Sequence, residues 1–229
     1  MAVAGPAHET GSMNPLDELW PVFGLRVRCG QVELRAVQDA DLPAMVALVQ
    51  AGVHDPARMP FAFPWTDLRG EEQVRDILQH HWRSRSELTP EKWSLELGVW
   101  RDGVLQGVQA VSTQNFPITR TGETGSWVGL AYQGRGTGTL MRQAICALCF
   151  DHLGFTQLTS GAFTDNPESM AVSRKVGYRP NGETRHKRRD EMAVNRNLVL
   201  TTDTFVRAPY GVDVEGVDAL RRLLGIDGI

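Results

Sequence analysis

The sequence predicts one mixed α/β domain whose elements follow the order β-α-α-β-β-β-α-β-α-β-β. Three observations support this order: short segments that alternate apolar and polar residues, longer runs with apolar residues at helical spacing, and glycine-containing turns between them. The chain of 229 residues has room for one domain with additional segments at its ends. Its hydrophobic content of 41% and charged content of 22% are typical of a globular protein.

The first half of the predicted domain contains a strand, two helices and a hairpin. The first strand alternates apolar and charged residues, and Asp39 and Asp41 precede the first helix as capping residues. Asp102-Gly103 is a residue pair that favours a two-residue hairpin turn. The elements expected here are a strand at 32–36, helices at 42–52 and 74–82, and paired strands at 93–100 and 104–111.

The second half of the predicted domain alternates strands and helices. A glycine-rich turn connects a strand to a long apolar helical run. Asp165 and Asn166 precede a proline that suits the first turn of a helix, and Gly177 is a suitable end for that helix. The elements expected here are strands at 125–130 and 158–163, helices at 140–153 and 167–176, and two closing strands from 178 and over 192–200.

Both ends of the chain lie outside this element order. Residues 1–20 are expected to be a disordered leader, and residues 21–205 hold the domain. Residues 206–229 are expected to form an extension with a short helix, because its apolar residues share one face. That face fits either the domain itself or a second subunit, so a homodimer is one of two expected arrangements. The residues of this face are Val217, Leu220, Leu223 and Leu224.

Composition excludes several classes of protein. The formal net charge of −3 provides no basic field for nucleic acid, and the chain lacks the run of ~18 apolar residues that a membrane span needs. Residues 1–15 do not resemble a secretory signal. Cys146 and Cys149 form a C-x-x-C inside a predicted helix rather than at its start, so we interpret them as core residues and not as a redox pair. A reduced, cytoplasmic protein is therefore expected.

The glycine-rich turn at 132–138 is suited to binding phosphate. Glycine permits the positive φ angles of such turns and lets a ligand approach the backbone closely. The free N–H groups and the positive end of the following helix dipole attract anions. Arg135 and Gly136 replace the lysine and hydroxyl residue of a Walker loop, and Thr139 replaces the third glycine of a dinucleotide-binding turn. Gln133-x-x-Gly136-x-Gly138 instead fits the motif [Q/R]-x-x-G-x-[G/A].

This motif resembles the pyrophosphate-binding signature of the GNAT superfamily of acyl-CoA-dependent N-acyltransferases. The element order is similar to the GNAT fold, a mixed sheet splayed between its fourth and fifth strands, with acyl-CoA in the splay. A second stretch, Asn166-x-x-Ser169-x-x-Val172-Ser173 through Gly177-Tyr178, resembles the second GNAT signature. In having a serine at position 173 of this signature, the chain resembles the branch of the superfamily that contains ribosomal-protein N-terminal acetyltransferases. The resemblance covers about 150 residues of the chain.

The resemblance implies a set of acyl-CoA contacts and two catalytic candidates. Glu123 is the candidate general base, although Thr121–Gly125 also has the composition of an exposed turn. Ser173 occupies the position where many GNAT enzymes have a tyrosine acid, and serine is a far weaker acid; Tyr178 is interpreted as core. Backbone N–H groups of 128–130 are the expected oxyanion donors. The implied donor-binding residues are Val128, Gly129, Leu130, Gln133, Gly134, Arg135, Gly136, Thr137, Gly138, Thr139, Asn166 and Ser169.

The acceptor side is less well defined. Phe61, Phe63 and Trp65 lie in a loop stiffened by prolines and are predicted to line the acceptor pocket, or else to form a hydrophobic plug. His81 is a further acceptor-side candidate, against the alternative of a solvated helix face. The basic run 185–189 is interpreted as a solvated hairpin tip, with recognition of an acidic acceptor or acyl group as the alternative.

The predicted function is therefore acyl-CoA-dependent N-acyl transfer, with acetyl the expected group. The acyl group passes directly to a small-molecule or peptide amine in a ternary complex, and no metal is expected. Two alternatives remain open at this point: a non-catalytic acyl-CoA-binding module, and transfer of a larger acyl group such as succinyl.

Overall fold

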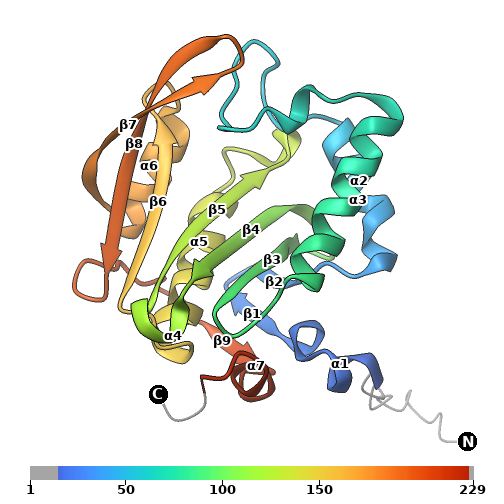
Figure 1. Cartoon of the computed structure of the whole chain (residues 1–229), viewed down its shortest axis with the longest axis vertical. Coiled ribbons are helices and arrows are strands. Elements are labelled where there is room, and N and C mark those ends of the chain that lie inside the picture. The colour runs from blue at the N-terminus through green and yellow to red at the C-terminus, as the bar shows by residue number, and fades with distance from the viewer. Residues whose placement is uncertain (1–14, 227–229) are drawn as a thin grey trace, which may run out of the picture.

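A nine-stranded mixed sheet forms the centre of the molecule, in the spatial order β7-β8-β6-β5-β4-β3-β2-β1-β9 (Figure 1). The computed structural model describes residues 15–226. The strands are β1 (Arg26–Cys29), β2 (Val32–Ala36), β3 (Lys92–Arg101), β4 (Val104–Gln114), β5 (Thr121–Val128), β6 (Gln157–Phe163), β7 (Arg179–Arg188), β8 (Glu191–Thr201) and β9 (Asp213–Glu215).

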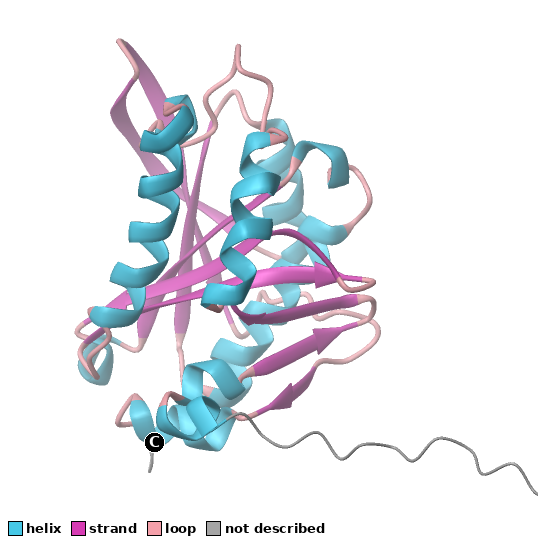
Figure 2. Cartoon of the chain, turned by 90° about the vertical axis from the view of Figure 1, so that its right-hand side faces the viewer, coloured by secondary structure: helices cyan, strands magenta, loops and turns pink. Residues whose placement is uncertain are grey.

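Helices lie on both faces of this sheet (Figure 2). Helices α2 and α3 pack on β4 and β3, whereas α5 packs on β1, β2, β4 and β5 and also contacts α6. The helices are α1 (Pro15–Leu19), α2 (Leu42–Gln50), α3 (Gly70–Ser86), α4 (Phe116–Thr119), α5 (Thr137–Ala147), α6 (Pro167–Val176) and α7 (Val217–Leu223), with a π-helical turn at Leu148–His152 after α5.

The predicted fold class and element order are confirmed. The elements predicted for the domain correspond to β2, α2, α3, β3, β4, β5, α5, β6, α6, β7 and β8, and α7 is the short helix expected in the C-terminal extension. The structure adds α1, β1, α4 and β9. The β3–β4 hairpin turns at Asp102 and Gly103, with φ angles of 53° and 74°. Two consecutive residues with positive φ are what a type I′ hairpin turn requires, which explains why Asp-Gly predicted it.

Strand β5 begins earlier in the chain than predicted, at Thr121 and not at 125. Residues 121–125 form the first part of β5 and are not a turn, because they pair with β4 over Ser112↔Glu123 to Ala110↔Gly125. A Cβ at Gly122 would lie 2.7 Å from a ring carbon of Phe155 and from the carbonyl oxygen of Ser112. Gly122 is present because neighbouring atoms approach the backbone closely at this position. The turn-like composition of residues 121–125 was therefore misleading.

The C-terminal segment packs on the protein's own core. β9 pairs antiparallel with β1 through Val27↔Val214 and forms one edge of the sheet. On α7 and just after it, Leu220, Leu224 and Ile226 are buried in the larger of the two core clusters. Residues 1–14 of the expected leader lie outside the described residues, and α1 occupies most of the remainder of that segment.

The two cysteines of the C-x-x-C are core residues, as predicted. Cys146 and Cys149 are completely buried among the side chains between α5 and the sheet. Burial raises the pKa of Cys146 to about 12 and that of Cys149 well above its ordinary value. Both therefore remain protonated thiols at neutral pH, which makes them poor nucleophiles.

Candidate active site

The sheet opens between β5 and β6, the only parallel neighbours among the described strands (Figure 1). They pair only at Thr121↔Gln157, Gly122↔Leu158 and Glu123↔Thr159. Beyond this point β5 continues to Val128 and β6 to Phe163 without further pairing between them. The facing edge of β5 therefore keeps backbone groups that an extended, amide-containing ligand can use. We refer to this opening as the β5–β6 gap.

Backbone groups of β5 that face the gap come from alternate residues. The carbonyl of Gly125 accepts from Gln109 on β4, whereas those of Gly122 and Thr124 accept hydroxyl hydrogen bonds from β6. By this alternation, the N–H groups of Ser126 and Val128 face the gap.

This arrangement narrows the predicted set of oxyanion donors. The N–H of Gly129 donates to the carbonyl of Gln106 at 2.8 Å, and the N–H of Leu130 donates to the carbonyl of Gly52 at 2.9 Å. Both groups are thus used within the protein. Of the three predicted donors, only Val128 has its N–H directed into the gap.

The glycine-rich turn forms an open cradle at the start of α5. Gly134 and Gly136 have φ angles of 74° and 82°, and a Cβ added to either would meet no atom within 4 Å. Within residues 15–226, the N–H groups of 134–138 donate to no protein acceptor. Free N–H groups, open space and a helix N-terminus together fit a bound pyrophosphate.

Two polar side chains of this turn shape it and do not point into it. The amide of Gln133 donates to the carbonyls of Val53 and Val128, both at 2.8 Å. Thr137 is buried, and its hydroxyl donates to the side chain of Gln106 at 3.2 Å. Their identities in the motif therefore reflect the conformation of the loop. Arg101 also fixes the turn through the carbonyl of Arg135 at 3.1 Å.

Helix α6 contributes the residues of the second predicted signature. The side-chain oxygen of Asn166 accepts from the N–H of Ser169 at 3.0 Å and caps the helix. Its side-chain N–H₂ donates to no protein group in the described part of the chain, which leaves it available to a ligand. Ser173 is buried, and so is Tyr178, whose hydroxyl lies 2.7 Å from that of Thr124. Tyr178 is thus a core residue, as predicted.

Glu123 lies at the closed end of the gap. It forms the last parallel pair with Thr159, it is opposite Ser112 on β4, and it is exposed. Its side chain lies on the same face of β5 as that of Trp127, which packs with the core beneath α2 and α3. The side chains of Thr124 and Ser126 lie on the opposite face. The carboxylate is therefore accessible from the α2–α3 side.

An aromatic cluster covers the α2–α3 side near the open end of the gap. Phe61 and Trp65 have ring centroids 5.2 Å apart, and Trp65 lies 5.8 Å from Trp127. Phe63 is instead 69% exposed and takes no part in this cluster. Trp127 was not predicted as a member, because a tryptophan inside a strand carries no sign of which loop will cover it.

His81 does not reach the gap, contrary to the prediction. Its side chain is buried and lines a small cavity with Trp20, Phe23 and Val37 on the far side of α3. The neighbouring His80 lies 3.6 Å from the carboxylate of Glu96 instead. Neither histidine therefore supports the predicted acceptor contact. Helical spacing alone did not show that the N-terminal segment covers this face.

Burial gives His81 a measurable effect on stability. Burial lowers its pKa from 6.5 to about 4, so between these values the unfolded chain binds a proton that the folded chain does not. The free energy of unfolding should therefore fall as pH decreases from 6.5 to 4, by up to about 3 kcal/mol from this group, and be fully retained above 6.5. Urea unfolding should show a weaker decline for His81→Phe. Parallel pH curves for the two proteins would contradict this assignment.

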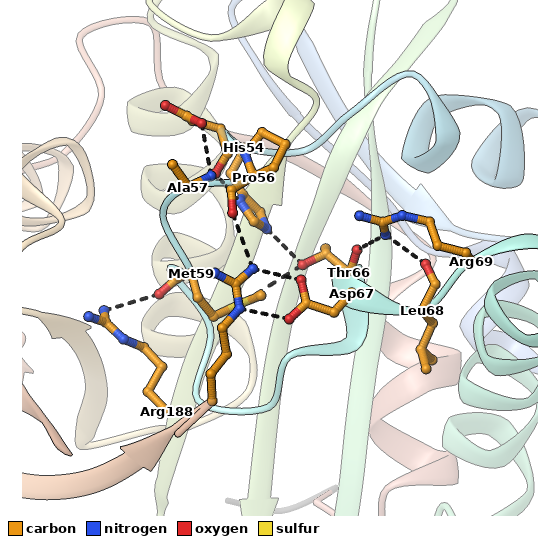
Figure 3. Close-up of polar contacts among 11 residues, drawn as sticks. His54, Pro56, Ala57, Met59, Thr66, Asp67, Leu68, Arg69 and Arg188 are labelled. Atoms are coloured by element: carbon orange, nitrogen blue, oxygen red, sulfur yellow. Dashed lines mark hydrogen bonds and ion pairs between the residues drawn. The ribbon is translucent and has the colours of Figure 1, made fainter. Parts of the chain in front are cut away.

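A cluster of arginine contacts, here called the arginine clasp, joins the two sides of the open end, and Figure 3 shows its contacts to Pro56, Met59 and Asp67. On the β7–β8 hairpin, Arg188 donates to Asp165 at 2.8 and 2.6 Å and to the carbonyl of Met59 at 3.1 Å. Arg189 donates to Asp67 at 2.8 and 2.7 Å and to the carbonyl of Pro56 at 3.2 Å. The hairpin belongs to the β6 side of the gap, and the loop 51–69 follows α2, which packs on the β5 side.

The basic run 185–189 is partly paired with acidic residues and is not the solvated tip that its composition predicted. Two of its five residues, Arg188 and Arg189, are engaged by Asp165 and Asp67, whose pKa values are lowered by the hydrogen bonds that they accept. The tip of this hairpin is therefore not simply solvated. Local sequence gave no indication of it, because both partners are distant in the chain.

No group of three or more His, Cys, Asp or Glu side chains in residues 15–226 is arranged to hold a metal ion. None of the helices in the same range combines the length and apolarity needed to cross a bilayer.

Comparison with solved structures identifies relatives of this fold. Mycobacterium smegmatis RimJ in complex with CoA-disulfide has a TM-score of 0.66 at 19% identity, covering 89% of this chain and 95% of its own. RimL, the ribosomal L7/L12 alpha-N-protein acetyltransferase, in complex with coenzyme A has a TM-score of 0.60 at 18% identity, covering 76% of this chain and 96% of its own. The Salmonella typhimurium acetyl transferase that modifies the N-terminal serine of L7/L12 gives 0.61 at 17%, covering 76% and 96%. At these identities the likeness concerns the fold.

A family model identifies the chain more directly. The model described as "Acetyltransferase (GNAT) domain" matches residues 31–179, which is more than half of the chain and includes β5, the glycine-rich turn and α6. The chain therefore belongs to the GNAT acetyltransferase family and is an acyl-CoA-dependent N-acyltransferase.

Proposed function

We propose that the enzyme transfers an acetyl group from acetyl-CoA to the α-amine of a peptide or protein N-terminus. The observation that supports this most strongly is the β5–β6 gap, with the open glycine cradle at one end and the exposed carboxylate of Glu123 at the other. The RimL structure and the Salmonella typhimurium structure, which share this fold, are of enzymes that act on the N-terminus of a ribosomal protein. A protein N-terminus is accordingly our first choice of acceptor.

In this proposal the donor lies along the edge of β5. The N–H groups of 134–138 hold the pyrophosphate, and Arg135 adds positive charge beside it. The pantetheine arm then extends into the gap, where its amides pair with backbone groups of β5, and the free side-chain N–H₂ of Asn166 is within the same region at the start of α6. Thr139 lies in the first turn of α5 and Ser169 in the first turn of α6.

The acceptor amine approaches from the α2–α3 side. Glu123 lies five residues from Val128 along β5, roughly 16 Å at ~3.3 Å per residue, so it removes a proton from the ammonium group through a chain of water molecules. The amine nitrogen then attacks the thioester carbonyl. The N–H of Val128 donates to the oxyanion of the tetrahedral intermediate. Phe61 and Trp65 wall the acceptor path, whereas Phe63 and His81 are no longer included.

A panel of donors and acceptors tests this proposal. Acetyl-CoA and succinyl-CoA are each incubated with a peptide bearing a free N-terminus, the same peptide with an acetylated N-terminus and one lysine, and a polyamine. Mass spectrometry of the acceptors and release of free CoA thiol are measured together. We expect acetylation of the free N-terminus above that of the other acceptors. Transfer to the polyamine alone would contradict the assigned acceptor class.

The arginine clasp should limit the size of the acceptor. The side chains of Arg189 and Asp67 are 36% and 39% exposed, so their ion pair is weak enough to open. An acceptor too bulky to pass beneath the closed clasp binds only the protein whose clasp is open. Its apparent affinity is therefore its intrinsic affinity multiplied by the fraction of protein in the open form. The quantity to compare is the ratio of kcat/KM for a lysine in a folded protein to kcat/KM for the N-terminus of a short peptide. Arg189→Gln and Asp67→Asn should each raise this ratio about two- to fivefold.

Arg196→Gln is the matched control for this experiment. Arg196 pairs with Glu183 on the same hairpin at 2.8 Å and with similar exposure, but this pair does not cross the gap. High salt should reproduce the effect of Arg189→Gln in the unmodified protein, because exposed ion pairs are screened. Equal acceptor preference in all variants would show that the clasp does not restrict entry.

A further inference from the structure

Arg142 on α5 is a buried positive charge without an acidic partner. The residue is 4% exposed, and none of the ion pairs in the described part of the chain includes it. Its guanidinium donates to three neutral oxygens: the side chains of Gln109 at 3.3 Å, Ser160 at 3.2 Å and Ser126 at 2.7 Å. A buried charge that lacks a counter-charge is costly, so its presence calls for a negative group that is bound during function.

The guanidinium of Arg142 lies beside the β5–β6 gap and contacts both of its strands. Ser126 is on β5 and Ser160 is on β6, one residue beyond Thr159 of the last parallel pair. The guanidinium therefore bridges the two strands where they begin to separate, on the α5 side. Glu123 faces the opposite, α2–α3 side at the same end of the gap. A thioester in the gap would thus have a carboxylate on one side and a guanidinium on the other.

The neighbouring hydroxyl groups are poorly suited to protonating a leaving thiolate. Ser173 is a weak acid, and the hydroxyl of Tyr178 is engaged with Thr124 at 2.7 Å and Cys146 at 3.7 Å. Burial also raises the pKa of Tyr178 well above its ordinary value. A guanidinium carries five N–H donors, of which only three are used by these oxygens, so it retains donors for a further anion.

We propose that Arg142 stabilises the CoA thiolate as it leaves. In the transfer step, a C–N bond forms between the acceptor amine and the acyl carbon. Glu123 has by then released the ammonium proton to solvent, and the second amine proton passes to it through the same water molecules. The C–S bond then breaks and its electron pair remains on sulfur as the thiolate, beside the guanidinium. Arg142 keeps its own proton and acts through its charge and remaining N–H groups. This inference rests on the proposed donor site in the β5–β6 gap.

The pKa of the thiol of bound CoA tests this role without an acceptor. Ultraviolet absorbance of the thiolate is followed during pH titration of CoA bound to the unmodified protein, to Arg142→Met and to Arg142→Lys. A nearby positive charge should place the bound thiol about one to three pH units below free CoA in the same buffer. Arg142→Met should abolish this difference and lower kcat roughly a hundredfold, whereas Arg142→Lys should retain part of both.

Ser160→Ala is the matched control, because it removes one hydrogen bond from the guanidinium and keeps the charge. The bound thiol should remain shifted in this variant. If Arg142→Met does not fold, the unmodified protein still decides: a bound thiol that titrates like free CoA overturns the role of Arg142. Absence of CoA binding in calorimetry would overturn the proposed donor site as well.

The donor comparison separates this role from recognition of an acyl carboxylate. With acetyl-CoA as the preferred donor, Arg142→Met should slow transfer from acetyl-CoA and succinyl-CoA by similar factors. If the unmodified protein prefers succinyl-CoA and Arg142→Met reverses that preference, the guanidinium binds the acyl carboxylate and the proposed role is wrong.

Discussion

Gly136→Val is expected to abolish measurable binding of acetyl-CoA while the protein remains folded. Gly136 has a φ of 82°, which a β-branched residue adopts only with strain, and the added side chain would extend into the open cradle. Two or more charge-assisted hydrogen bonds to the pyrophosphate would be lost. Each contributes about 1.5–3 kcal/mol, so affinity should fall at least ~100-fold. Isothermal titration calorimetry measures the loss.

Gly211→Val provides the control for backbone strain. Gly211 also has a positive φ, 71°, and open space around its Cβ, but it lies in the connection between β8 and β9. Its substitution should lower stability without changing acetyl-CoA affinity. Gly138→Val is a less direct test, since its Cβ would lie 3.5 Å from Val172 and the larger side chain would press on α6. A folded Gly136→Val protein with normal affinity would show that the pyrophosphate binds elsewhere.

Glu123→Gln is expected to lower kcat by about 10²- to 10⁴-fold and leave acetyl-CoA binding unchanged. Glutamine keeps the shape of the side chain and cannot accept the ammonium proton. The expected size of the effect follows from the position of Glu123, exposed at the end of the parallel pairing and on the face opposite Arg142. Steady-state kinetics with a peptide acceptor, together with calorimetry of acetyl-CoA, separates turnover from donor binding.

Glu183→Gln is the control for removal of a carboxylate. Glu183 is an exposed residue of β7 that pairs with Arg196, away from the gap. Its loss should leave kcat unchanged. If Glu123→Gln retains full activity across the pH range, another group removes the proton. An ordered water held by Ser112 and Thr159, the neighbours of Glu123 on β4 and β6, would then be the first alternative to test.

Much of the fold was predictable because its signals are local. Asp102-Gly103 specified a hairpin turn, and the glycines at 134 and 136 specified a turn between a strand and a helix. The motif positions in α6 were also recognisable from the sequence. These features depend on backbone conformations that only a few residue types adopt readily.

The features that the sequence did not predict depend on contacts between distant segments. β9 is a short edge strand that pairs with β1, and no local pattern marks it. Asp67 and Asp165 gave no sign of their arginine partners more than 20 positions away. The acceptor contact predicted for His81 was wrong for the same reason, because the segment at Trp20 covers it only in the folded chain. The contact of the Gln133 amide with Val53 likewise forms only in the folded chain.

Arg142 illustrates this limit most clearly. A charged residue in a helix is ordinarily interpreted as solvent-facing, and its burial depends on three oxygens from three different strands. Only the folded sheet brings Gln109, Ser126 and Ser160 around it. The residue that we assign to the leaving group was therefore absent from the predicted site.

One measurement tests the central claim most directly. A peptide with both a free α-amine and a lysine side chain is incubated with the unmodified protein and acetyl-CoA, and tandem mass spectrometry locates the added acetyl group while free CoA thiol is quantified. We predict one acetyl group on the α-amine, matched by an equal amount of thiol and lost in Glu123→Gln. Acetylation confined to the lysine, or thiol release without peptide acetylation, would contradict the proposed function.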